Sequence, residues 1–477
     1  MRELLMRKTK IVCTIGPATD DDSVMRQVML SGMNVARFNF SHGDHATHEK
    51  RFEQISRLRE ELGLPIATLM DTRGPEIRLG KFVDDKSVTI ETGDTYTLTT
   101  DDVLCDDKVG SISFKNLPRD VKPGVHILVN DGVIEMVVEK VTVTTIVCHV
   151  IHGGVLSNNK GINVPGVQLS MPYLSESDKN DLEFAAKMGF DFIAASFVRT
   201  SADIDYLRKY TQSLGWFDVR IIAKIENVEG VRNIDEILEA SDGIMVARGD
   251  LGVEIPFEQI PSVQKQLIRK GYQAGKQVIT ATQMLESMIT NPRPTRAEIT
   301  DVANAIYDGT SAIMLSGETA AGAFPVEVVR TMDLIARTTE DDIDYKGMHS
   351  ASRTKKNADI ANAIAHATVT TAHDLDAAAI LTVTMSGVTA REISKYRPCC
   401  PIISCTVSER VRRQMNLSWG VYPMLVDEVS NTDSLFDASI HAALRSDLVN
   451  KGDIVVITAG APVGVSNTTN MMKVERI

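Results

Sequence analysis

The most constraining feature of this chain is a repeated alternation of strand-like and helix-like segments, interrupted once by a stretch without helix signals. Strands that alternate with helical stretches favour a parallel sheet. Eight such units favour a closed (β/α)8 barrel over an open doubly wound sheet. The eight expected strands are 10–15, 34–39, 66–71, 192–197, 220–225, 243–247, 277–281 and 312–315.

The interruption falls between the third and fourth of these strands. Residues 76–171 contain runs of Val, Thr and Ile that are split by Gly and Asp, with a period-2 texture typical of strands. The pattern predicts a small all-β lid domain inserted at 76–171. The barrel would then consist of residues 1–75 and 172–344.

A third domain is expected after the barrel. The polar stretch KGMHSASRTKKN that follows residue 344 predicts a linker, and helix-strand alternation resumes beyond it. We expect a helix from Ala358 and strands at 378–383, 402–406 and 454–458. These elements predict a C-terminal α/β domain at 345–477, so that 477 residues form about three domains.

The charge balance and the cysteine pattern limit the partners and the compartment. Acidic residues outnumber basic ones by 63 to 51, and a net charge of −12 does not favour nucleic acid or anionic lipid as a partner. No segment approaches the roughly 20 apolar residues of a membrane span, and the N-terminus has no apolar run of signal-peptide length. None of the six cysteines forms a C-x-x-C pair. We therefore expect a soluble cytoplasmic protein without nucleic-acid or membrane partners.

Polar side chains gather where six of the expected strands end, which is the face of a barrel that carries active sites. In RFNFSHG, period-2 alternation sends Arg37, Asn39 and Ser41 to one side of the strand. An amphipathic edge strand would explain one such case, but barrel strands are apolar on both faces. The other strand ends carry Asp71 and Thr72; Lys224 and Glu226; Arg248, Gly249 and Asp250; Thr280, Thr282 and Gln283; and Ser316 and Glu318.

The residue types at these ends indicate a reaction class. Glu226 and Asp250 follow neighbouring strands without a nearby His or Cys, and oxygen ligands of this kind suit Mg²⁺ or Mn²⁺. Arg37 and Lys224 add fixed positive charge. A metal with Arg and Lys is what a transferring phosphoryl group requires, because negative charge spreads over its oxygens.

A second cation site is expected beside the first. Asn39, Ser41, Asp71 and Thr72 offer oxygens with a single charge among them, which suits a monovalent cation. The chain has no G-x-x-x-x-G-K-[ST] loop and no G-x-G-x-x-G after a strand. P-loop chemistry is therefore excluded, and nicotinamide binding has no support.

Three histidines after the second strand raise the alternative of a zinc site. His42, His45 and His48 are spaced by three residues, which would put the latter two on one helix face. Zinc sites usually bring a fourth ligand. We favour the start of a solvent-facing helix, with His42 close to the site.

The motifs RFNFSHGD, MDTRGPEIR, AKIEN, GIMVARGDLGVEIP, TATQMLESMITNPRPTRAE and MLSGETAAGAFP together resemble those of the pyruvate kinase family. The resemblance runs from KIVCTIGPAT to TTNMMKV. It implies an eight-stranded barrel with a β lid after the third strand and a C-terminal α/β domain. It also implies transfer of the phosphoryl group of phosphoenolpyruvate to ADP, the last step of glycolysis, by a homotetramer. Residues 1–5 precede the typical start of the family and would be an extension or a misassigned start.

The resemblance also implies residue roles. Arg37 and Lys224 would hold the phosphoryl group, with Glu226 and Asp250 on Mg²⁺. The remaining implied sets are Gly249 and Thr282 for the substrate carboxylate or enolate, Asn39, Ser41, Asp71 and Thr72 for K⁺, and Arg78, Lys160 and His42 for ADP or ATP. Ser316 and Glu318 are expected as further catalytic residues from their place at the end of the eighth strand.

Dependence on K⁺ is implied by a single position. Glu at the place of Glu76 accompanies K⁺ activation in the family, whereas Lys there accompanies K⁺ independence. A Lys ammonium could replace the charge of the missing cation, so Glu76 predicts that a monovalent cation is required.

The third domain contains a possible effector site. Strand 378–383 runs into TMSGVTARE, where Thr384, Ser386 and Thr389 offer hydroxyls around Gly387. One hydroxyl would suffice as a helix N-cap, whereas three favour a phosphate pocket. The family's sugar-phosphate effectors bind at the matching loop. Val388 stands where relatives often have a side-chain donor, so a sugar monophosphate or AMP is as strong a candidate as fructose 1,6-bisphosphate.

Two rival functions remain open at this point. A different phosphoenolpyruvate or oxoacid enzyme, such as a lyase or mutase, could use the same carboxylate pair, although the lid and the monovalent-cation residues argue against it. A catalytically inactive metabolite sensor would require loss of Lys224, Glu226 or Asp250, and all three are present.

Overall fold

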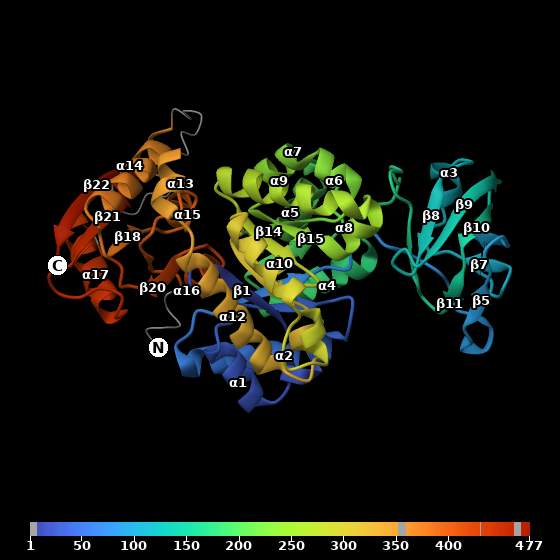
Figure 1. Cartoon of the computed structure of the whole chain (residues 1–477), viewed down its shortest axis with the longest axis horizontal. Coiled ribbons are helices and arrows are strands. Elements are labelled where there is room, and N and C mark those ends of the chain that lie inside the picture. Colours follow the sequence, from blue (N-terminus) through green and yellow to red (C-terminus); the bar gives the residue numbers. More distant parts are fainter. Residues whose placement is uncertain (1–6, 352–358, 430, 462–468) are drawn as a thin grey trace.

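The computed structural model describes residues 7–351, 359–429, 431–461 and 469–477. Figure 1 shows three bodies in a row, with the barrel in the middle, the inserted β domain on one side and the C-terminal domain on the other. The expected start at 1–5, the second half of the expected linker and Ala358 lie outside the described residues.

The central body is a closed barrel of eight parallel strands in the order β1-β17-β16-β15-β14-β13-β3-β2. The predicted fold class is therefore confirmed. Closure comes from the pairing of Lys10 with Ala312, which joins the first strand to the last. The strands are β1 (Lys10–Thr14), β2 (Val35–Asn39), β3 (Ala67–Asp71), β13 (Phe192–Ala195), β14 (Arg220–Ile225), β15 (Gly243–Ala247), β16 (Gln277–Ala281) and β17 (Ala312–Leu315).

Helices surround the barrel because apolar side chains alternate along each strand, one set filling the interior and the other facing the helices. Val12, Leu69 and Ile222 belong to the fully buried inner cluster. The helices are α1 (Asp22–Leu30), α2 (His45–Leu62), α4 (Glu176–Met188), α5 (Ser201–Ser213), α6 (Val228–Arg232), α7 (Ile234–Ala240), α8 (Arg248–Glu254), α9 (Ile260–Gln273), α10 (Arg296–Tyr307), α11 (Gly317–Ala320) and α12 (Pro325–Asp341).

The inserted domain is almost entirely β, as predicted, with a single short helix, α3 (Leu117–Asp120), that the sequence pattern did not indicate. A seven-stranded sheet has the order β4-β12-β8-β9-β10-β6-β7, and β11 pairs with β5. The strands are β4 (Ile77–Arg78), β5 (Val88–Ile90), β6 (Thr95–Thr99), β7 (Val109–Ser111), β8 (His126–Val129), β9 (Ile134–Val141), β10 (Thr145–His152), β11 (Gly154–Leu156) and β12 (Gly161–Asn163).

The C-terminal domain is a five-stranded sheet in the order β20-β19-β18-β21-β22, parallel except for its last strand. Helices pack on it through two apolar clusters, one on each face. Its elements are α13 (Tyr345–Ala351), α14 (Ile360–Asp374), β18 (Ala379–Val383), α15 (Val388–Ser394), β19 (Ile402–Thr406), α16 (Glu409–Met415), β20 (Val421–Leu425), α17 (Thr432–Arg445), β21 (Ile454–Gly460) and β22 (Thr469–Arg476).

Two expectations for this domain were wrong. The first half of the expected linker is the helix α13, in which Tyr345 and His349 are buried although the local sequence is polar. Strands β20 and β22 were missed. Pro423 lies inside β20, where it removes a hydrogen-bond donor, and β22 is an edge strand with most of its side chains exposed.

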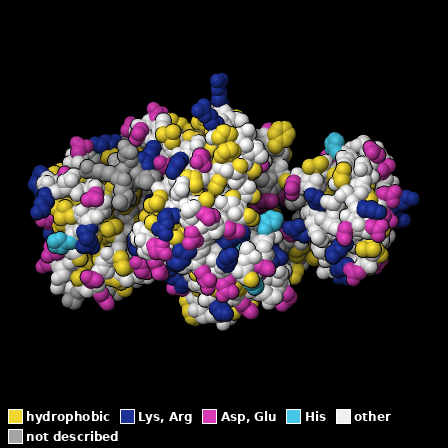
Figure 2. All heavy atoms as spheres, turned by 90° about the horizontal axis from the view of Figure 1, so that it is seen from below, with side chains coloured by type: hydrophobic (Ala, Val, Ile, Leu, Met, Phe, Trp, Pro, Cys, Tyr) yellow, Lys and Arg dark blue, Asp and Glu magenta, His cyan; other side chains and the backbone are white. Residues whose placement is uncertain are grey.

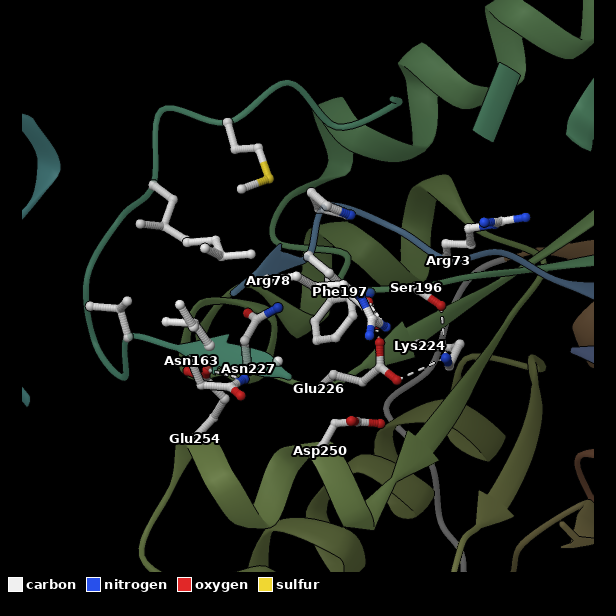
Figure 3. A pocket seen from close by; sticks show the side chains of 18 of the residues that line it. Arg73, Arg78, Asn163, Ser196, Phe197, Lys224, Glu226, Asn227, Asp250 and Glu254 are labelled. Carbon is white, nitrogen blue, oxygen red and sulfur yellow. Dashed lines mark hydrogen bonds and ion pairs between the residues drawn. The ribbon is translucent and has the colours of Figure 1, made fainter. Parts of the chain in front are cut away.

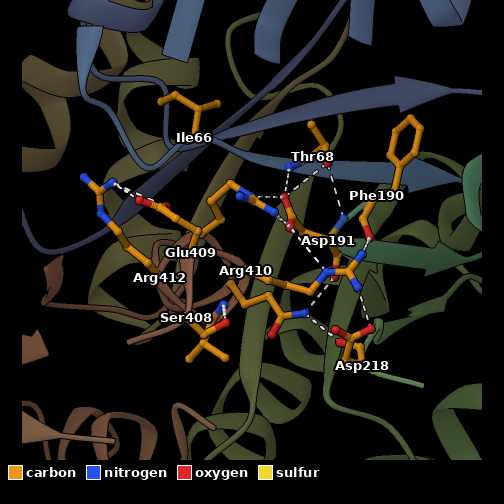
Figure 4. Close-up of polar contacts among 12 residues, drawn as sticks. Ile66, Thr68, Phe190, Asp191, Asp218, Ser408, Glu409, Arg410 and Arg412 are labelled. Atoms are coloured by element: carbon orange, nitrogen blue, oxygen red, sulfur yellow. Dashed lines mark hydrogen bonds and ion pairs between the residues drawn. The ribbon is translucent and has the colours of Figure 1, made fainter. Parts of the chain in front are cut away.

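The C-terminal domain docks on the end of the barrel where the strands begin. Leu417 is fully buried and belongs to the inner cluster of the barrel. Beside it, α16 inserts charged side chains around Asp191, the residue that precedes β13, as Figure 4 shows. Arg413 Nε lies 3.0 Å and 3.1 Å from the two oxygens of Asp191, and Thr68 N donates to the same carboxylate at 2.9 Å.

The surface does not carry one sign of charge. Figure 2 shows basic and acidic side chains interspersed over one face, with a hollow between the barrel and the inserted domain. Among the described residues, no helix has both the length and the apolar character needed to cross a membrane.

Candidate active site

A cavity of about 890 Å³ lies between the carboxyl ends of the barrel strands and the inserted domain. Figure 3 shows side chains from both bodies pointing into it. It is lined by eleven of the residues predicted for the site: Arg37, Asn39, Ser41, His42, Asp71, Thr72, Arg78, Lys160, Lys224, Glu226 and Asp250. Gly249, Thr282, Ser316 and Glu318 do not line this cavity.

Lys224 lies at the centre of the polar contacts. Its ammonium is 3.0 Å from Asp71 Oδ1 and 2.9 Å from Glu226 Oε1, and it donates to Ser196 Oγ at 2.7 Å. Burial alone would lower the pKa of Lys224, but the charges of Asp71 and Glu226 outweigh burial and raise it. The side chain is therefore a fixed positive charge at neutral pH.

Arg37 supplies the second cation. Its Nε donates to Asp71 Oδ2 at 2.6 Å, and its Nη1 donates to Thr14 Oγ1 at 2.9 Å. Burial would raise the pKa of Asp71, but Arg37 and Lys224 hold it below its ordinary value. Asp71 thus orients both cations toward the cavity.

Glu226 and Asp250 form the carboxylate pair predicted for a divalent metal. Glu226 is fully buried, and burial with the nearby charge of Asp250 outweighs Lys224 and raises its pKa to about 8. Asp250, in the first turn of α8, has no hydrogen bond or ion pair within the described part of the chain. A buried carboxylate beside a half-buried one, neither fully neutralised, has the chemistry of a hard-cation site. Among the described residues, no group of three or more His, Cys, Asp or Glu side chains could hold a metal.

The four oxygen-bearing residues predicted for K⁺ line the same cavity, and parts of them are already engaged. Asn39 Oδ1 accepts from Ser41 N at 3.2 Å. Asp71 uses both oxygens on Arg37 and Lys224. A monovalent cation here would have to share the charge of Asp71 with these two cations.

Ser196 is a residue that the sequence pattern did not single out. Its hydroxyl donates to the carbonyl of Thr72 at 2.6 Å and accepts from Lys224 at 2.7 Å, so it bridges β3 and β14. The next residue, Phe197, has a left-handed φ of 54°, and its N–H donates to Glu226 Oε2 at 2.6 Å. A Ser within the apolar run FIAASFV gave no polar alternation that could have revealed it.

Gly249 and Thr282 meet beside the carboxylate pair. Gly249 N donates to Thr282 Oγ1 at 2.8 Å, and Thr282 Oγ1 donates to the carbonyl of Ala281 at 2.6 Å. Thr282 has a left-handed φ of 70°. Arg248 holds this turn by donating to the Thr282 carbonyl at 2.5 Å, while Asp301 pairs with it at 2.7 Å.

Ser316 and Glu318 have contacts typical of a structural role. Glu318 is buried and accepts from Ser316 N at 2.6 Å and from Leu285 N at 3.2 Å. It thereby ties the end of β17 to the loop after β16. Burial raises the pKa of Glu318 despite these hydrogen bonds.

The predicted nucleotide contacts face the cavity from the inserted domain. Arg78 donates to the Asn159 carbonyl at 2.9 Å and to Glu76 Oε2 at 2.8 Å. Glu76 and Arg78 thus form an ion pair. Lys160 follows in the same loop, and His42 is exposed at the barrel side.

The other two histidines have protein partners. His45 Nε2 lies 2.6 Å from Asp181 Oδ1, and His48 Nε2 lies 2.9 Å from the carbonyl of His42. His48 also stacks on Phe40, with ring centroids 4.3 Å apart. The helix start is confirmed, since α2 begins at His45, but the expectation that it faces solvent was wrong for His48, whose ring is buried against Phe40.

The predicted effector loop has two of its hydroxyls buried and engaged. Thr384 Oγ1 accepts from Gly387 N at 3.0 Å, and Thr389 Oγ1 lies 2.7 Å from Thr469 Oγ1. Gly387 has a left-handed φ of 78°. The side chain of Ser386 is the one hydroxyl of the three without a hydrogen bond to the described residues.

Comparisons with known proteins agree with this arrangement. Residues 6–329 match the pyruvate kinase barrel-domain model, and residues 362–475 match the pyruvate kinase alpha/beta-domain model. A pyruvate kinase of Sporosarcina psychrophila is 50% identical over 99% of this chain and 81% of its own length. One of Clostridium acetobutylicum is 46% identical over 98% of this chain and 99% of its own length.

A solved structure is similar over the whole chain. The pyruvate kinase of Cryptosporidium parvum superposes with a TM-score of 0.94 and 40% identity, covering 100% of this chain and 97% of the other. Likeness of this extent in sequence, fold and domain order, around a cavity lined by Arg37, Lys224, Glu226 and Asp250, leaves one conclusion: the chain belongs to the pyruvate kinase family.

Proposed function

We propose that the cavity is the active site in which this enzyme transfers the phosphoryl group of phosphoenolpyruvate to ADP. The observation that carries the proposal is the buried pair of Lys224 and Arg37, held by Asp71 beside the carboxylates of Glu226 and Asp250. Two fixed cations, beside two carboxylates that could bind a metal ion, would stabilise the negative charge that develops on a phosphoryl group during its transfer.

Glu226 and Asp250 would hold Mg²⁺ or Mn²⁺. When bound, the divalent cation supplies a Lewis acid that polarises substrate oxygens and offsets their negative charge. The raised pKa of Glu226 supports the assignment, because a carboxylate that is costly to ionise by itself gains from a cation.

The chain's own residues divide the reaction between two sides. Lys224 and Arg37 would bind and orient the phosphoryl oxygens, and Asp71 would keep both side chains aligned. Thr282 accepts a hydrogen bond from Gly249 N and lies beside Asp250 rather than in the cavity lining. By the family resemblance, it would contact the carboxylate or enolate end of the substrate. Proton delivery to the enolate then belongs to the Thr282 side. The buried contacts of Glu318 support a positioning role for it and Ser316.

Arg78, Lys160 and His42 would contact the nucleotide. Their support is that two of them lie on the inserted domain and one on the barrel, around a single cavity. Asn39, Ser41, Asp71 and Thr72 would bind K⁺, supported by oxygen donors with one shared carboxylate. Because Glu76 pairs with Arg78, its negative charge contributes less to binding of a cation, and the main support for a K⁺ site is the set of oxygen donors.

A phosphorylated activator, a homotetramer and a cytoplasmic location complete the proposal. Their support is the family resemblance, together with six free cysteines. Ser386 and the left-handed Gly387 would form the effector contact. Ser386→Asp should then remove activation by a sugar phosphate or AMP through charge repulsion, while activity at saturating phosphoenolpyruvate persists. Unchanged activation of this variant would contradict the site.

One assay tests the reaction. Pyruvate formation from phosphoenolpyruvate should require ADP together with Mg²⁺, and should rise strongly with K⁺ but little with Li⁺, which dehydrates reluctantly. Pyruvate without ADP would favour a lyase or phosphatase. No turnover would favour a sensor, and full activity without K⁺ would contradict the monovalent site alone.

A further inference from the structure

A second, much smaller cavity lies where the C-terminal domain meets the barrel, far from the strand ends that carry the active site. It is enclosed by the turn between α9 and β16 on the barrel and by α15 and the segment after it on the C-terminal domain. Its volume is about 10 Å³. A space of this size holds one water molecule or one monatomic ion.

The charged residues in the lining of this cavity are basic, although the carboxylate of Glu392 lies beside it, next to Gly275. Its lining contains Lys276, Arg391, Lys395 and Arg397 and no carboxylate. Lys395 is paired with Glu392 at 2.8 Å. The other three cations have no ion pair within 4.0 Å in the described part of the chain.

Arg397 is the clearest case. The side chain is only 6% exposed, and its Nη2 donates to the carbonyl of Gly309 at 2.6 Å. Its Nε and Nη1 are buried without any hydrogen-bond partner. Burial lowers the pKa of Arg397 to about 10, so the guanidinium is charged at neutral pH. A buried charge without a counter-ion is costly, and such groups are normally paired.

Two aromatic rings partly offset the free-energy cost of burying this charge. The guanidinium lies 4.5 Å from the ring centroid of Trp419 and 5.8 Å from that of Tyr272. Cation–π contacts stabilise the charge, but they leave the in-plane N–H groups of Arg397 unsatisfied. An anion in the cavity that Arg397 lines could accept from these two donors, whereas Lys276 Nζ already donates to the Ser241 carbonyl at 2.6 Å.

We propose that this cavity binds a small monatomic anion of the size of chloride, held by Arg397 between the barrel and the C-terminal domain. A volume of about 10 Å³ suits a monatomic ion better than a whole phosphate or sulfate, and the basic lining favours an anion over water. The ion would accept from Arg397 Nε and Nη1 and would neutralise charge contributed by both domains. It would act as a counter-ion at the interface, apart from the reacting groups.

Bromide tests the site directly, because it replaces chloride and can be located by anomalous scattering. Crystals of the full chain soaked in sodium bromide should show an anomalous peak within contact distance of Arg397 Nε and Nη1. Water density at that position without an anomalous peak would overturn the proposal. This arm needs no variant.

The second arm works in solution. At constant K⁺ and ionic strength, the wild type should have a higher melting temperature in chloride than in the bulky anion gluconate, because a ligand that binds the folded state stabilises it. Arg397→Met should lose this chloride dependence, and the exposed-surface control Lys86→Met should retain it.

Arg397→Met could disrupt folding, so Arg391→Met serves as the second variant. It keeps the primary donors and removes a neighbouring charge, and the half-saturating chloride concentration should rise several-fold. Equal melting temperatures of the wild type in chloride and gluconate would contradict the proposal, as would an unchanged chloride response in both variants.

Discussion

At the residue scale, the active site is organised around Lys224. Three neighbours fix its ammonium: Asp71, Glu226 and Ser196. The lysine side chain needs such support because it has four rotatable bonds and loses considerable entropy when held in one place. Oriented charge is useful for catalysis because it does not need to reorganise when the transition state forms.

Lys224→Met tests this orientation. The variant should lower kcat by roughly a hundred-fold or more, because the lost charge acts mainly on the transition state. The KM for phosphoenolpyruvate should change little. Exchange of solvent deuterium into the methyl group of pyruvate should continue, because proton transfer is assigned to the Thr282 side. Near-normal turnover, judged beside the surface control Lys86→Met, would refute the role of Lys224.

Glu226→Gln and Asp250→Asn test the carboxylate pair. Each change removes a carboxylate that would bind the metal in its ionised form, so the Mg²⁺ concentration for half-maximal activity should rise. Calorimetric Mn²⁺ binding should weaken in parallel, which separates a metal effect from a loss of catalysis. Glu239→Gln, on an exposed helix position, is the matched control. A Mg²⁺ titration that matches the wild type would remove these residues from the metal site.

Ser196→Ala tests the bridge that the sequence did not reveal. The change leaves Lys224 with one fewer acceptor and frees the Thr72 carbonyl, so kcat should fall about ten-fold and stability by about 1–3 kcal/mol. Ser196→Thr, which keeps the hydroxyl, should recover kcat. A loss of stability with unchanged kcat would show that the bridge is only structural.

At the scale of elements, the two ends of the barrel strands perform different tasks. The carboxyl ends carry the reactive side chains, and the beginnings are fixed to α16 through Asp191. Asp191 is fully buried, and β13 runs from its neighbour Phe192 to the turn that contains Ser196. Both the start and the end of the strand are therefore held by buried hydrogen bonds.

Arg413→Met should destabilise the fold by about 3 kcal/mol, because it leaves the buried charge of Asp191 undercompensated. Arg412→Met is the matched control from the same helix. Arg412 pairs with the exposed Glu409 and donates to the Gly63 carbonyl. Loss of the ion pair should lower the free energy of unfolding by less than about 1 kcal/mol, in addition to the loss of the hydrogen bond to Gly63. Urea unfolding measures both. Equal losses would mean that Asp191 is neutralised by other groups, such as Arg410 and Arg59.

Local sequence patterns predicted the barrel well because its strands are apolar on both faces and each is followed by a helix. The bounds of β14, β15, β16 and β17 agree with the prediction residue for residue. The prediction for β13 extended two residues too far, because the chain turns at the left-handed Phe197. Torsion angles of this kind depend on tertiary contacts, which a single sequence does not display.

The site was predictable only in part for a related reason. Alternation revealed Arg37, Lys224 and Glu226, because charged residues inside apolar strands are conspicuous. It could not reveal Ser196, and it could not show that Thr384 and Thr389 already have partners within the fold. Which hydroxyls remain free is a property of packing.

At the scale of the whole molecule, the cavity is built by two bodies that approach each other. Asn163 of the inserted domain donates to Glu254 of α8 at 3.1 Å, and Gln168 donates to Glu229 at 3.3 Å. Two of the residues assigned to the nucleotide, Arg78 and Lys160, lie on the inserted domain, whereas His42 and the phosphoryl and metal groups lie on the barrel. Nucleotide binding should thus be separable from enolate chemistry.

Lys160→Met should raise the KM for ADP about ten-fold, because a charge opposite the nucleotide phosphates is lost. Methyl-group exchange of pyruvate should be unaffected, since its groups lie on the barrel. Steady-state kinetics with each substrate varied, together with the exchange assay, measure the two effects. Lys140→Met, on an exposed position of β9, is the control. A parallel loss of exchange would place Lys160 with the enolate groups.

The insertion between β3 and β13 also has a consequence for biosynthesis. Strand β3 ends at Asp71 and its partner β13 begins at Phe192, so the ribosome must make the whole β domain before the next barrel strand appears. At typical elongation rates this takes roughly ten seconds. For that time β1, β2 and β3 present an unpaired edge, while the inserted domain can already fold. Nascent chains of this length are therefore where we expect chaperone binding to be strongest.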